Sequence, residues 1–590
     1  MRLLFDAEAD GLYPTKLWCI SAIDIDSREV YEYGPDQLDE GLELLSNATM
    51  LLGHNIISYD LPHIKRLHGI DLSHIPLCDT LVLSRLINPT REGGHSLEAW
   101  GVKLGFAKVE HEDWTKYTKA MQHRCTMDVR LNVKVYRRLM IDGKDFSEDS
   151  IELEHEVAKI MHQQEETGWL FDSYKANSLL AEVNDELGRT QDKVHETFKP
   201  KVFFEKRVVP KFKKDGTLSK SGLREDEYDA LIKSGDYSPF DRTYTQVFNL
   251  SSRQQIGIWL QDFGWKPTKF TDGSKGKAKK DRQPTVDEKV LAGIKGIPEA
   301  DLINRYLFLS KIRGFLVNWL DSVGEDGRQH GYVNPMGAVT GRMSHSKPNL
   351  AQVPSSKKEY GAECRSLFIV PEGYKLVGMD AAALELRMLA SYMRDQIYVE
   401  AAVSGTEELG TDIHTVNMNL AGLSSRDQAK TMYYALIYGA GDSKLGSIIG
   451  GKAAAGRQLK DRLFNEIPNL SDLIERIQTA ATKGYIKGLD GRLIKVRNVY
   501  SALNTLLQGG GAIVMKRALI LLNQYATDAG LDFKFVGNIH DEIQAEVLEE
   551  HAERFAELAE IAMEHAGEYY NMFCPLAGNA KIGNNWSETH

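Results

Sequence analysis

The feature that most constrains the fold of this chain is an apolar run, Leu376–Met379, that ends abruptly in the carboxylate of Asp380. Such a run predicts a buried strand, and the Ala- and Leu-rich residues that follow it predict a helix. An acid at the end of a core strand can face a cleft while the sheet holds its backbone rigid. An isolated aspartate at a strand end is more often a helix N-cap than a metal ligand, so its role depends on a partner.

A partner for Asp380 lies in the segment 533–547. Two strand-like halves flank a tight bend at His540 and Asp541, which puts Asp541 at the tip of a predicted hairpin. Carboxylates on neighbouring strand ends can hold two divalent cations about 3.5–4 Å apart. Such cations lower the pKa of an attacking hydroxyl group and neutralise a leaving phosphate. The two segments together favour phosphoryl-transfer chemistry.

Four further acids lie in the N-terminal quarter of the chain. Three short strands are predicted there, over Leu3–Glu8, Leu17–Ile25 and Glu29–Tyr33. Asp6 and Glu8 are two apart on the first strand, so their side chains leave the same face. A chance surface pair is the alternative for these two alone. Asp60 near a predicted helix start and Asp128 in a predicted helix over 116–139 complete the set.

A third pattern is a stripe of four side chains that recur every four residues: Arg426, Lys430, Tyr434 and Tyr438. This spacing puts them on one face of one helix. Core packing is the usual meaning of such a stripe, but Lys and Arg are rarely buried without a partner. The alternative is a triphosphate cradle, with the two cations on the phosphates and Tyr434 against the base and sugar.

These patterns resemble a known family. Asp380 and Glu385, followed by the string His540–Glu542, resemble motifs A and C of the family A DNA polymerases, and the stripe with Gly439 resembles their motif B. The four N-terminal acids resemble the DEDD superfamily of 3′→5′ exonucleases. The string Phe248–Gln254 and the tail after Gly583 are more similar to the replicative polymerases of T-seven-like bacteriophages than to bacterial repair enzymes. The resemblance covers nearly the whole chain.

The resemblance implies an α/β multidomain fold, in which a ribonuclease H-like exonuclease domain precedes a right-hand polymerase. The implied domains are the exonuclease at 1–145, the thumb at 146–330 with a short basic insertion at about 199–247, the palm at 331–411 and 491–590, and the fingers at 412–490.

The resemblance also implies roles for individual residues of the polymerase part. Asp380, Asp541 and the backbone carbonyl of Ala381 are expected to bind two Mg²⁺ ions, for which Mn²⁺ can substitute. The expected dNTP-binding residues are Glu385, His414, Arg426, Lys430, Tyr434 and Tyr438, with Lys430 also catalytic. The expected contacts to primer-template DNA are Arg342, Asn349, Gln352, Asn504, Gln508 and His540. Glu385, hydrogen-bonded to Tyr438, is expected to exclude a ribose 2′-hydroxyl group.

The exonuclease part departs from its relatives at one position. Asp6, Glu8, Asp60 and Asp128 are the implied ligands of a second pair of Mg²⁺ ions. The Tyr that polymerase-linked members carry four residues before the last Asp is here Arg124. His123 matches the general base of the other branch of the superfamily, and its pKa range suits that role. The alternative is that His123 is a surface residue and that proofreading is weakened.

Composition bounds the remaining interpretations. A chain of 590 residues is long enough for three or four packed units, and its net charge of −11 excludes only a uniformly basic surface. Five scattered cysteines without a CxxC pair argue against a zinc site or a disulfide framework and suit a reducing cytoplasm, here that of a bacterial host. We expect neither a signal peptide nor a membrane-length span.

Two basic segments interrupt the predicted thumb. Residues 199–224 hold nine Lys/Arg against two acids, and residues 266–282 hold seven against two. They are either solvated loops or contacts to duplex phosphates. In the phage group a larger thumb insertion captures host thioredoxin, so a thioredoxin-like processivity factor remains open here. A phage helicase/primase and a single-strand-binding protein are further expected partners.

Three rival functions remain at this point. A single-subunit RNA polymerase shares the palm and a similar fingers helix, a repair polymerase with weakened proofreading fits the Arg124 departure, and a non-catalytic nucleic-acid clamp would have lost its acids. Glu385 and the complete acid sets in both halves favour a phage-type DNA polymerase that replicates DNA and proofreads.

Overall fold

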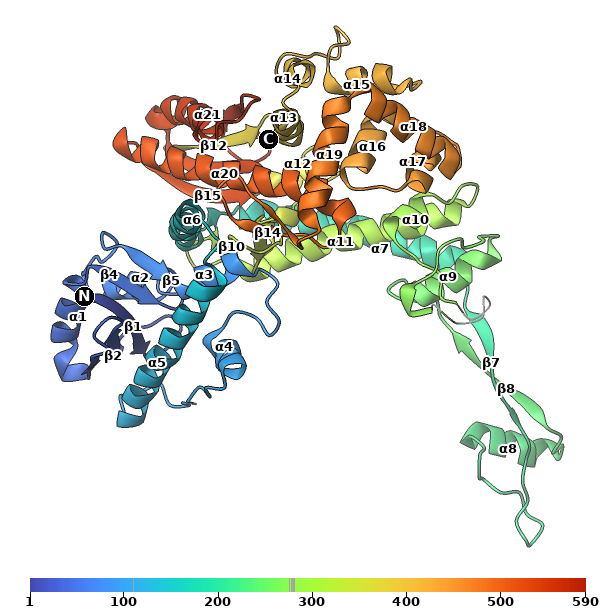
Figure 1. Cartoon of the computed structure of the whole chain (residues 1–590). Coiled ribbons are helices and arrows are strands. Elements are labelled where there is room, and N and C mark those ends of the chain that lie inside the picture. The colour runs from blue at the N-terminus through green and yellow to red at the C-terminus, as the bar shows by residue number, and fades with distance from the viewer. Residues whose placement is uncertain (110, 275, 277–281) are drawn as a thin grey trace. The chain divides into compact units, whose positions relative to one another are not determined.

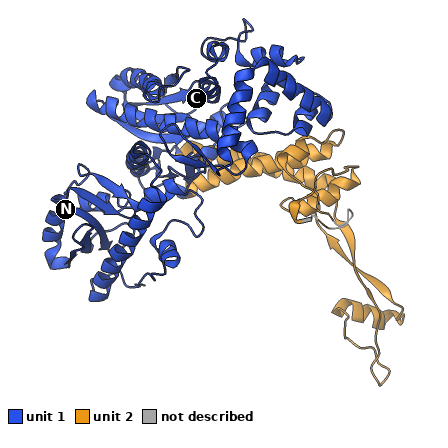
Figure 2. Cartoon of the chain, in the orientation of Figure 1, with its two compact units in different colours: residues 1–172, 322–590 blue, residues 173–321 orange. Residues whose placement is uncertain are grey.

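The computed structural model describes residues 1–109, 111–274, 276 and 282–590 (Figure 1). The chain forms two compact units, one of residues 1–172 with 322–590 and the other of residues 173–321 (Figure 2). Every residue that the sequence analysis assigned to a site lies in the first unit.

The first unit begins with a five-stranded mixed sheet in the order β3-β2-β1-β4-β5. Its strands are β1 (Arg2–Ala9), β2 (Leu17–Asp24), β3 (Val30–Tyr33), β4 (Met50–Gly53) and β5 (Leu77–Asp79). β1 is antiparallel to β2 and parallel to β4. The three predicted N-terminal strands are therefore confirmed, and no strand end differs from its predicted position by more than one residue.

Helices cover both faces of this sheet. They are α1 (Leu38–Ser46), α2 (Asp60–His68), α3 (Thr80–Ile87), α4 (Leu97–Leu104) and α5 (Lys119–Asp142). The strand period of two sends Leu3 and Phe5 into one apolar core and Leu4 into another. The second core includes Val129 of α5. Asp6 and Glu8 share the face of Leu4, so α5 packs over the strand face that carries both acids.

A second sheet, in the order β15-β16-β12-β17, forms the centre of the C-terminal half. Its strands are β12 (Tyr374–Ala381), β15 (Phe533–Ile539), β16 (Glu542–Leu548) and β17 (Gly578–Gly583). β15 and β16 form the predicted hairpin, and β12 lies antiparallel to β16. Helices α12 (Gly361–Arg365), α13 (Leu384–Met393), α20 (Ala502–Asp528) and α21 (Ala552–Tyr569) accompany this sheet. The strand–helix prediction around Asp380 is confirmed.

Helix α20 corrects one expectation. It is long and apolar enough to cross a membrane by length and composition, although the sequence analysis expected no such span. In its most apolar window 78% of the helix is buried inside the protein. Buried residues along its length, such as Leu506, Ile513 and Leu519, belong to the main hydrophobic core. The apolar run is therefore explained by packing in the centre of the fold.

The remaining elements of the first unit connect the two sheets and extend from the second. They are α6 (Glu148–Thr167), β6 (Trp169–Leu170), β9 (Arg328–Gln329), β10 (Tyr332–Asn334), β11 (Ser344–Ser346), α14 (Gln396–Val403), α15 (Ile413–Ala421), α16 (Arg426–Ile437), α17 (Asp442–Ile448), α18 (Ala453–Glu466), α19 (Pro468–Ala481), β13 (Tyr485–Lys487) and β14 (Leu493–Lys495). The helix predicted for the Arg426–Tyr438 stripe is confirmed as α16.

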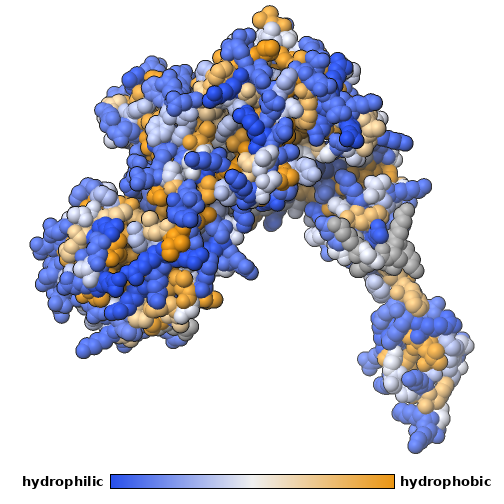
Figure 3. All heavy atoms as spheres, viewed as in Figure 1, coloured by the Kyte–Doolittle hydropathy of each residue, from blue (hydrophilic) through white to orange (hydrophobic). Residues whose placement is uncertain are grey.

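The described part of the second unit is built from helices and one long hairpin. Its elements are α7 (Ser173–Thr197), β7 (Lys201–Val208), α8 (Glu225–Ser234), β8 (Phe240–Gln246), α9 (Arg253–Asp262), α10 (Glu288–Ala292) and α11 (Pro298–Ser322). The basic segment 199–224 contains β7, and exposed apolar side chains such as Phe204 and Phe212 lie in the same region, where Figure 3 shows hydrophobic atoms at the surface. The basic segment 266–282 lies in part outside the described residues.

Candidate active sites

The end of β12 and the β15–β16 turn bring two acids together. Asp380 is paired in register with Glu542, and the backbone N–H of Ala381 donates to the Asp541 carbonyl oxygen at 3.0 Å. Asp380 and Asp541 therefore lie at the same end of one sheet. His540 has φ 60°, a left-handed conformation that a tight hairpin turn demands and that costs a non-Gly residue on the order of 1–3 kcal/mol.

The electrostatics of this pair suit a cation. Burial, together with the negative charges of Asp541 and Glu542, raises the pKa of the Asp380 carboxyl to about 6. Carboxylates of like charge in a partly buried site repel each other, and a divalent cation removes that repulsion. The donor set of two carboxylates and a backbone carbonyl at Ala381 is one that Mg²⁺ accepts.

Glu542, the third acid of this region, is engaged elsewhere. Its carboxylate accepts hydrogen bonds from Trp586 Nε1 and Gln544 Nε2, each at 2.5 Å. His590 Nδ1 lies 3.0 Å from it and Arg365 Nη1 3.8 Å. The C-terminal tail thus anchors Glu542. Among the described residues, no hydrogen bond or ion pair engages the carboxylate of Asp541, so it is the acid of this turn that can bind a metal ion. No role of this kind is expected for Trp586 or His590 from the sequence alone.

The predicted DNA contacts surround the same acids in part. Arg342, His540 and Asp541 line one cavity. Asn504 lies half-buried on α20, and Asn349 is half-buried as well. The Oδ1 atoms of both residues have no hydrogen-bond partner among the described residues. Gln508 is half-buried one turn after Asn504, and Gln352 ends a short 3₁₀ turn over Leu350–Gln352.

Glu385 has a different neighbour from the one expected. Arg342 Nη2 lies 3.6 Å from Glu385 Oε1. Burial raises the pKa of Glu385, and Arg342 acts against that rise. The expected hydrogen bond to Tyr438 is not among the described contacts, and Tyr438 is 50% exposed. The expectation of a Glu385–Tyr438 hydrogen bond is therefore corrected, because Arg342 provides the nearer charged partner.

The stripe on α16 faces away from the core, as its two cations require. Lys430 and Tyr438 are exposed, whereas Met432, Tyr433 and Leu436 on the other side of the helix are buried.

Two acids and an imidazole lie beside this stripe. Arg426 is held by Asp412 at 3.1 Å and Glu407 at 3.2 Å, and the His414 ring centroid lies 6.2 Å from that of Tyr434. Where the helix ends, Gly439 has φ 74°, and a Cβ there would lie 2.4 Å from the Tyr500 carbonyl oxygen, so no larger residue fits.

A second acid cluster lies in the N-terminal sheet. Asp6, Glu8, Asp60 and Asp128 line one open cleft of about 1060 Å³. Asp60 stands at the start of α2, and its Oδ1 atom accepts the backbone N–H of Ala7 at 3.2 Å, which ties the helix to β1. The four predicted acids are therefore brought together by β1, α2 and α5.

This cluster also fits metal ions. Burial raises the pKa of Glu8 to about 7 and of Asp60 to about 8, and burial with the charge of Glu8 raises the pKa of Asp6. Asp128 is buried, and its Oδ1 atom has no hydrogen-bond partner among the described residues. Buried carboxylates with spare acceptor capacity are typical divalent-cation ligands.

The two candidate residues before Asp128 point in different directions. Arg124, one helical turn before Asp128, forms an ion pair with Glu8 and lies 3.6 Å from Asp128 Oδ2. His123 is exposed and is not among the described residues that line the cleft. Neighbouring residues of a helix differ by about 100° in direction, so α5 can aim only one of the two at the acids. The expectation that His123 is the general base is corrected accordingly.

Sequence reasoning missed two other groups of this cleft. Lys108 Nζ lies 3.0 Å from Asp128 Oδ2. His54 lines the cleft, and burial lowers its pKa to about 4. Neither belongs to a motif or a periodic pattern, so no signal in the sequence singled them out.

Comparison with known proteins gives the family of the chain, two relatives and a similar solved structure. The family model described as DNA polymerase family A matches residues 232–588. The DNA-directed DNA polymerases of Enterobacteria phage T3 and Escherichia phage T7 are 33% and 32% identical to this chain, over 100% of both chains in each case. The POL domain of Pol1 from M. smegmatis, solved with DNA primer-template and dNTP, is 19% identical and has a TM-score of 0.76; the match covers 100% of this chain and 95% of that one. This last likeness confirms the expected fold.

Proposed function

Because this chain belongs to DNA polymerase family A, we propose that it is a DNA-directed DNA polymerase of phage replication with an attached 3′→5′ proofreading exonuclease. The observation that supports the polymerase activity most strongly is the meeting of Asp380 and Asp541 at one end of a rigid sheet. In the proposed reaction the primer 3′-hydroxyl group attacks the α-phosphate of a dNTP, and pyrophosphate leaves.

Asp380, Asp541 and the Ala381 carbonyl are the proposed ligands of two Mg²⁺ ions, which Mn²⁺ can replace. When bound, the ions supply Lewis-acid stabilisation of the attacking and leaving oxygens. The sheet holds both carboxylates in place before substrate arrives, so little reorganisation is needed during the reaction. The raised pKa of Asp380 supports this assignment, since it reflects burial beside the negative charges of Asp541 and Glu542, which a bound cation would offset.

The exposed face of α16 is the proposed dNTP site. Arg426 and Lys430 present cations to the β- and γ-phosphates, and Lys430 adds catalysis by stabilising the charge of the leaving pyrophosphate. Tyr434, with His414 beside its ring, offers an aromatic surface to the base and sugar. Tyr438, directly after the last residue of α16, is the fourth side chain of the stripe and part of the proposed dNTP site.

Glu385 is the proposed sugar gate. A half-buried carboxylate held near Arg342 would occupy the space that a ribose 2′-hydroxyl group needs. This role supports a DNA polymerase over the RNA polymerase alternative.

The proposed contacts to primer-template DNA are Arg342, Asn349, Gln352, Asn504, Gln508 and His540. Amide and guanidinium groups suit the minor groove, where the acceptors are nearly the same for every base pair. The side-chain amides of Asn349 and Asn504 can donate N–H to these acceptors, and no hydrogen bond within the described residues holds their Oδ1 atoms.

The proposed second activity is removal of nucleotides from a 3′ end. It is supported by the single cleft that Asp6, Glu8, Asp60 and Asp128 share, and by the unpaired Oδ1 atom of Asp128. These four acids are the proposed ligands of a second pair of Mg²⁺ ions. With His123 exposed, the cleft offers no imidazole at the position of the expected base. A metal ion bound by the four acids would lower the pKa of the attacking water.

The proposed domains keep the expected boundaries, with the exonuclease at 1–145, the thumb at 146–330, the palm at 331–411 and 491–590, and the fingers at 412–490. The β7–β8 hairpin lies within the short insertion at 199–247, where a thioredoxin-like host factor would bind if one is recruited. A helicase/primase and a single-strand-binding protein are further proposed partners, in the cytoplasm of a bacterial host.

Primer extension tests the proposal directly. The full chain, a primed DNA template and Mg²⁺ should yield full-length product with dNTPs and little with ribonucleotides. Preference for ribonucleotides would indicate the RNA polymerase alternative, and failure to extend would indicate a binding clamp. Excision of a 3′-labelled single strand, lost in an Asp6→Asn variant, tests the second activity.

A further inference from the structure

Two cations occupy the centre of the N-terminal acid cluster. The Arg124 guanidinium pairs with Glu8 through one nitrogen and lies 3.6 Å from Asp128 through another. Lys108 Nζ lies 3.0 Å from the same Asp128 oxygen. Both positive charges therefore pair with carboxylates that the proposed exonuclease would need for metal ions.

The structure holds Arg124 in this position from three sides. Its Nε atom donates to the Val109 carbonyl oxygen at 3.2 Å, and its guanidinium carbon lies 4.7 Å from the centre of the Trp114 ring. Its position four residues before Asp128 on α5 puts both on one helix face. The side chain is only 12% exposed, so solvent screens this charge little.

Arg124 competes with a divalent cation in this position. A guanidinium stays protonated at any working pH, so it cannot leave the acids by losing its charge. It can leave only for another anion. A phosphodiester is an anion that a guanidinium binds through two parallel hydrogen bonds, and the open cleft of about 1060 Å³ that Arg124 lines gives a strand end access to it.

We propose that Arg124 is a phosphate-operated gate of the metal site. Without DNA, its guanidinium neutralises Glu8 and Asp128. When a DNA 3′ end enters, the guanidinium binds a phosphate instead, and the two acids become free to bind metal ions. Metal and single-stranded DNA then bind cooperatively, and by linkage each raises the affinity of the other by the same factor. Lys108, which is 28% exposed, supports the same gate at Asp128. The inference rests on the proposed exonuclease function.

The test measures metal affinity rather than cleavage. In the full chain carrying Asp380→Asn and Asp541→Asn, which remove metal ligands of the polymerase site, Mn²⁺ binding is followed by electron paramagnetic resonance. The titration is made with and without a short oligodeoxynucleotide that has phosphorothioate linkages at its 3′ end. We expect the oligonucleotide to raise Mn²⁺ affinity by roughly 5- to 150-fold.

Two variants remove the gate. Arg124→Ala and Arg124→Gln should both bind Mn²⁺ more tightly without DNA, and the oligonucleotide should no longer raise that affinity. The Gln variant keeps hydrogen-bonding capacity and guards against misfolding of the Ala variant. Arg130→Ala, which removes an exposed arginine of the same helix, should behave like the parent. The salt dependence of oligonucleotide binding should also weaken, by a slope of about 0.7 for one lost phosphate contact.

A further variant separates the two levels of the proposal. Asp6→Asn in the same background should abolish the measured Mn²⁺ binding. If binding persists, or if no variant binds Mn²⁺, the acids do not form a metal site and the proposed exonuclease is wrong. If Asp6→Asn abolishes binding but both Arg124 variants keep the parent affinity, DNA effect and salt slope, the gate alone is overturned.

Discussion

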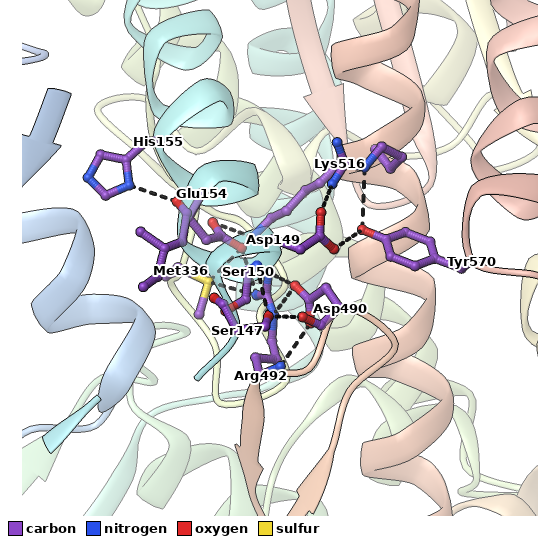
Figure 4. Close-up of polar contacts among 12 residues, drawn as sticks. Ser147, Asp149, Ser150, Glu154, His155, Met336, Asp490, Arg492, Lys516 and Tyr570 are labelled. Carbon is purple, nitrogen blue, oxygen red and sulfur yellow. Dashed lines mark hydrogen bonds and ion pairs between the residues drawn. The ribbon is translucent and has the colours of Figure 1, made fainter. Parts of the chain in front are cut away.

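Lys516 Nζ lies 2.6 Å from Oε1 and 2.8 Å from Oε2 of Glu154, although 362 positions separate the two residues in the sequence. Both side chains are buried, and Figure 4 shows them pointing toward each other from α20 and α6. Arg492 Nη1 lies 2.6 Å from Glu154 Oε1, and Arg492 Nη2 lies 2.6 Å from Asp490 Oδ2. Two acids and two bases thus balance inside the protein and join α6, α20 and the turn before β14.

This quartet predicts a large effect of one neutral substitution. Glu154→Gln leaves two buried cations with a single acid, Asp490, and should lower the free energy of unfolding of this region by about 3–5 kcal/mol. Denaturant unfolding followed by tryptophan fluorescence measures the change. Glu152→Gln, at an exposed position of the same helix, should change stability by less than about 0.5 kcal/mol. Similar losses in both variants would show that the quartet contributes nothing specific.

Asp380→Asn and Asp541→Asn should each lower the rate of nucleotide incorporation by at least about 10²-fold while DNA binding stays largely intact. Each carboxylate stabilises charge that develops only in the transition state, so its loss affects the reaction more than the binding. Single-turnover primer extension and a DNA-binding titration measure the two effects. Glu550→Gln, at an exposed acid, is the matched control. Extension by either variant within tenfold of the parent rate would remove that residue from the metal site.

Glu385→Ala should weaken discrimination against ribonucleotides by roughly 10- to 200-fold, the range expected when a close steric contact is removed. Because Arg342 loses its partner at 3.6 Å, the affinity for primer-template should change as well. Incorporation of matched dNTP and ribonucleotide pairs gives the ratio. Arg342→Lys, which keeps the charge beside Glu385, should preserve discrimination. Unchanged discrimination in Glu385→Ala would revive the RNA polymerase alternative.

His123→Ala should leave the excision rate of single-stranded DNA unchanged, because the His123 side chain lies on the exposed side of α5. Asp128→Asn, five residues later and inside the cleft, should lower the same rate by about 10²-fold or more. A 3′-end-labelled oligonucleotide and Mg²⁺ suffice for the comparison. A loss in His123→Ala comparable to that in Asp128→Asn would restore His123 as the base.

His54 predicts a pH effect on stability. Burial lowers its pKa to about 4 from the ordinary value near 6.5, so between these two values the unfolded chain binds a proton that the folded chain does not. Acidification through pH 6.5 to 4 should therefore reduce the free energy of unfolding, by at most on the order of 3 kcal/mol from this group. His54→Asn should flatten this dependence, whereas His74→Asn, at an exposed position, should not. Equal slopes for parent and His54→Asn would exclude His54 as the cause.

The sequence by itself determined the elements that depend on local patterns. The apolar run before Asp380 became β12, the bend at His540 and Asp541 became the hairpin turn, and the four-residue stripe became the exposed face of α16. Alternation, turn chemistry and helical spacing are encoded within a few neighbouring residues, so they can be read without knowledge of the fold. Asp380 was found as the break in an apolar pattern and Asp541 at a predicted turn, whereas Asp60 and Asp128 were identified through the resemblance to the DEDD exonucleases.

Only the tertiary structure decided which distant side chains meet. The rotation of α5 against its sheet, which turns Arg124 inward and His123 outward, is set by packing in a core that local spacing does not describe. The ion pairs Lys108–Asp128 and Lys516–Glu154 join segments whose separation in sequence carries no signal. A buried charge is stable only where its counter-charge arrives from elsewhere in the fold, and that arrival depends on the direction of every element between them.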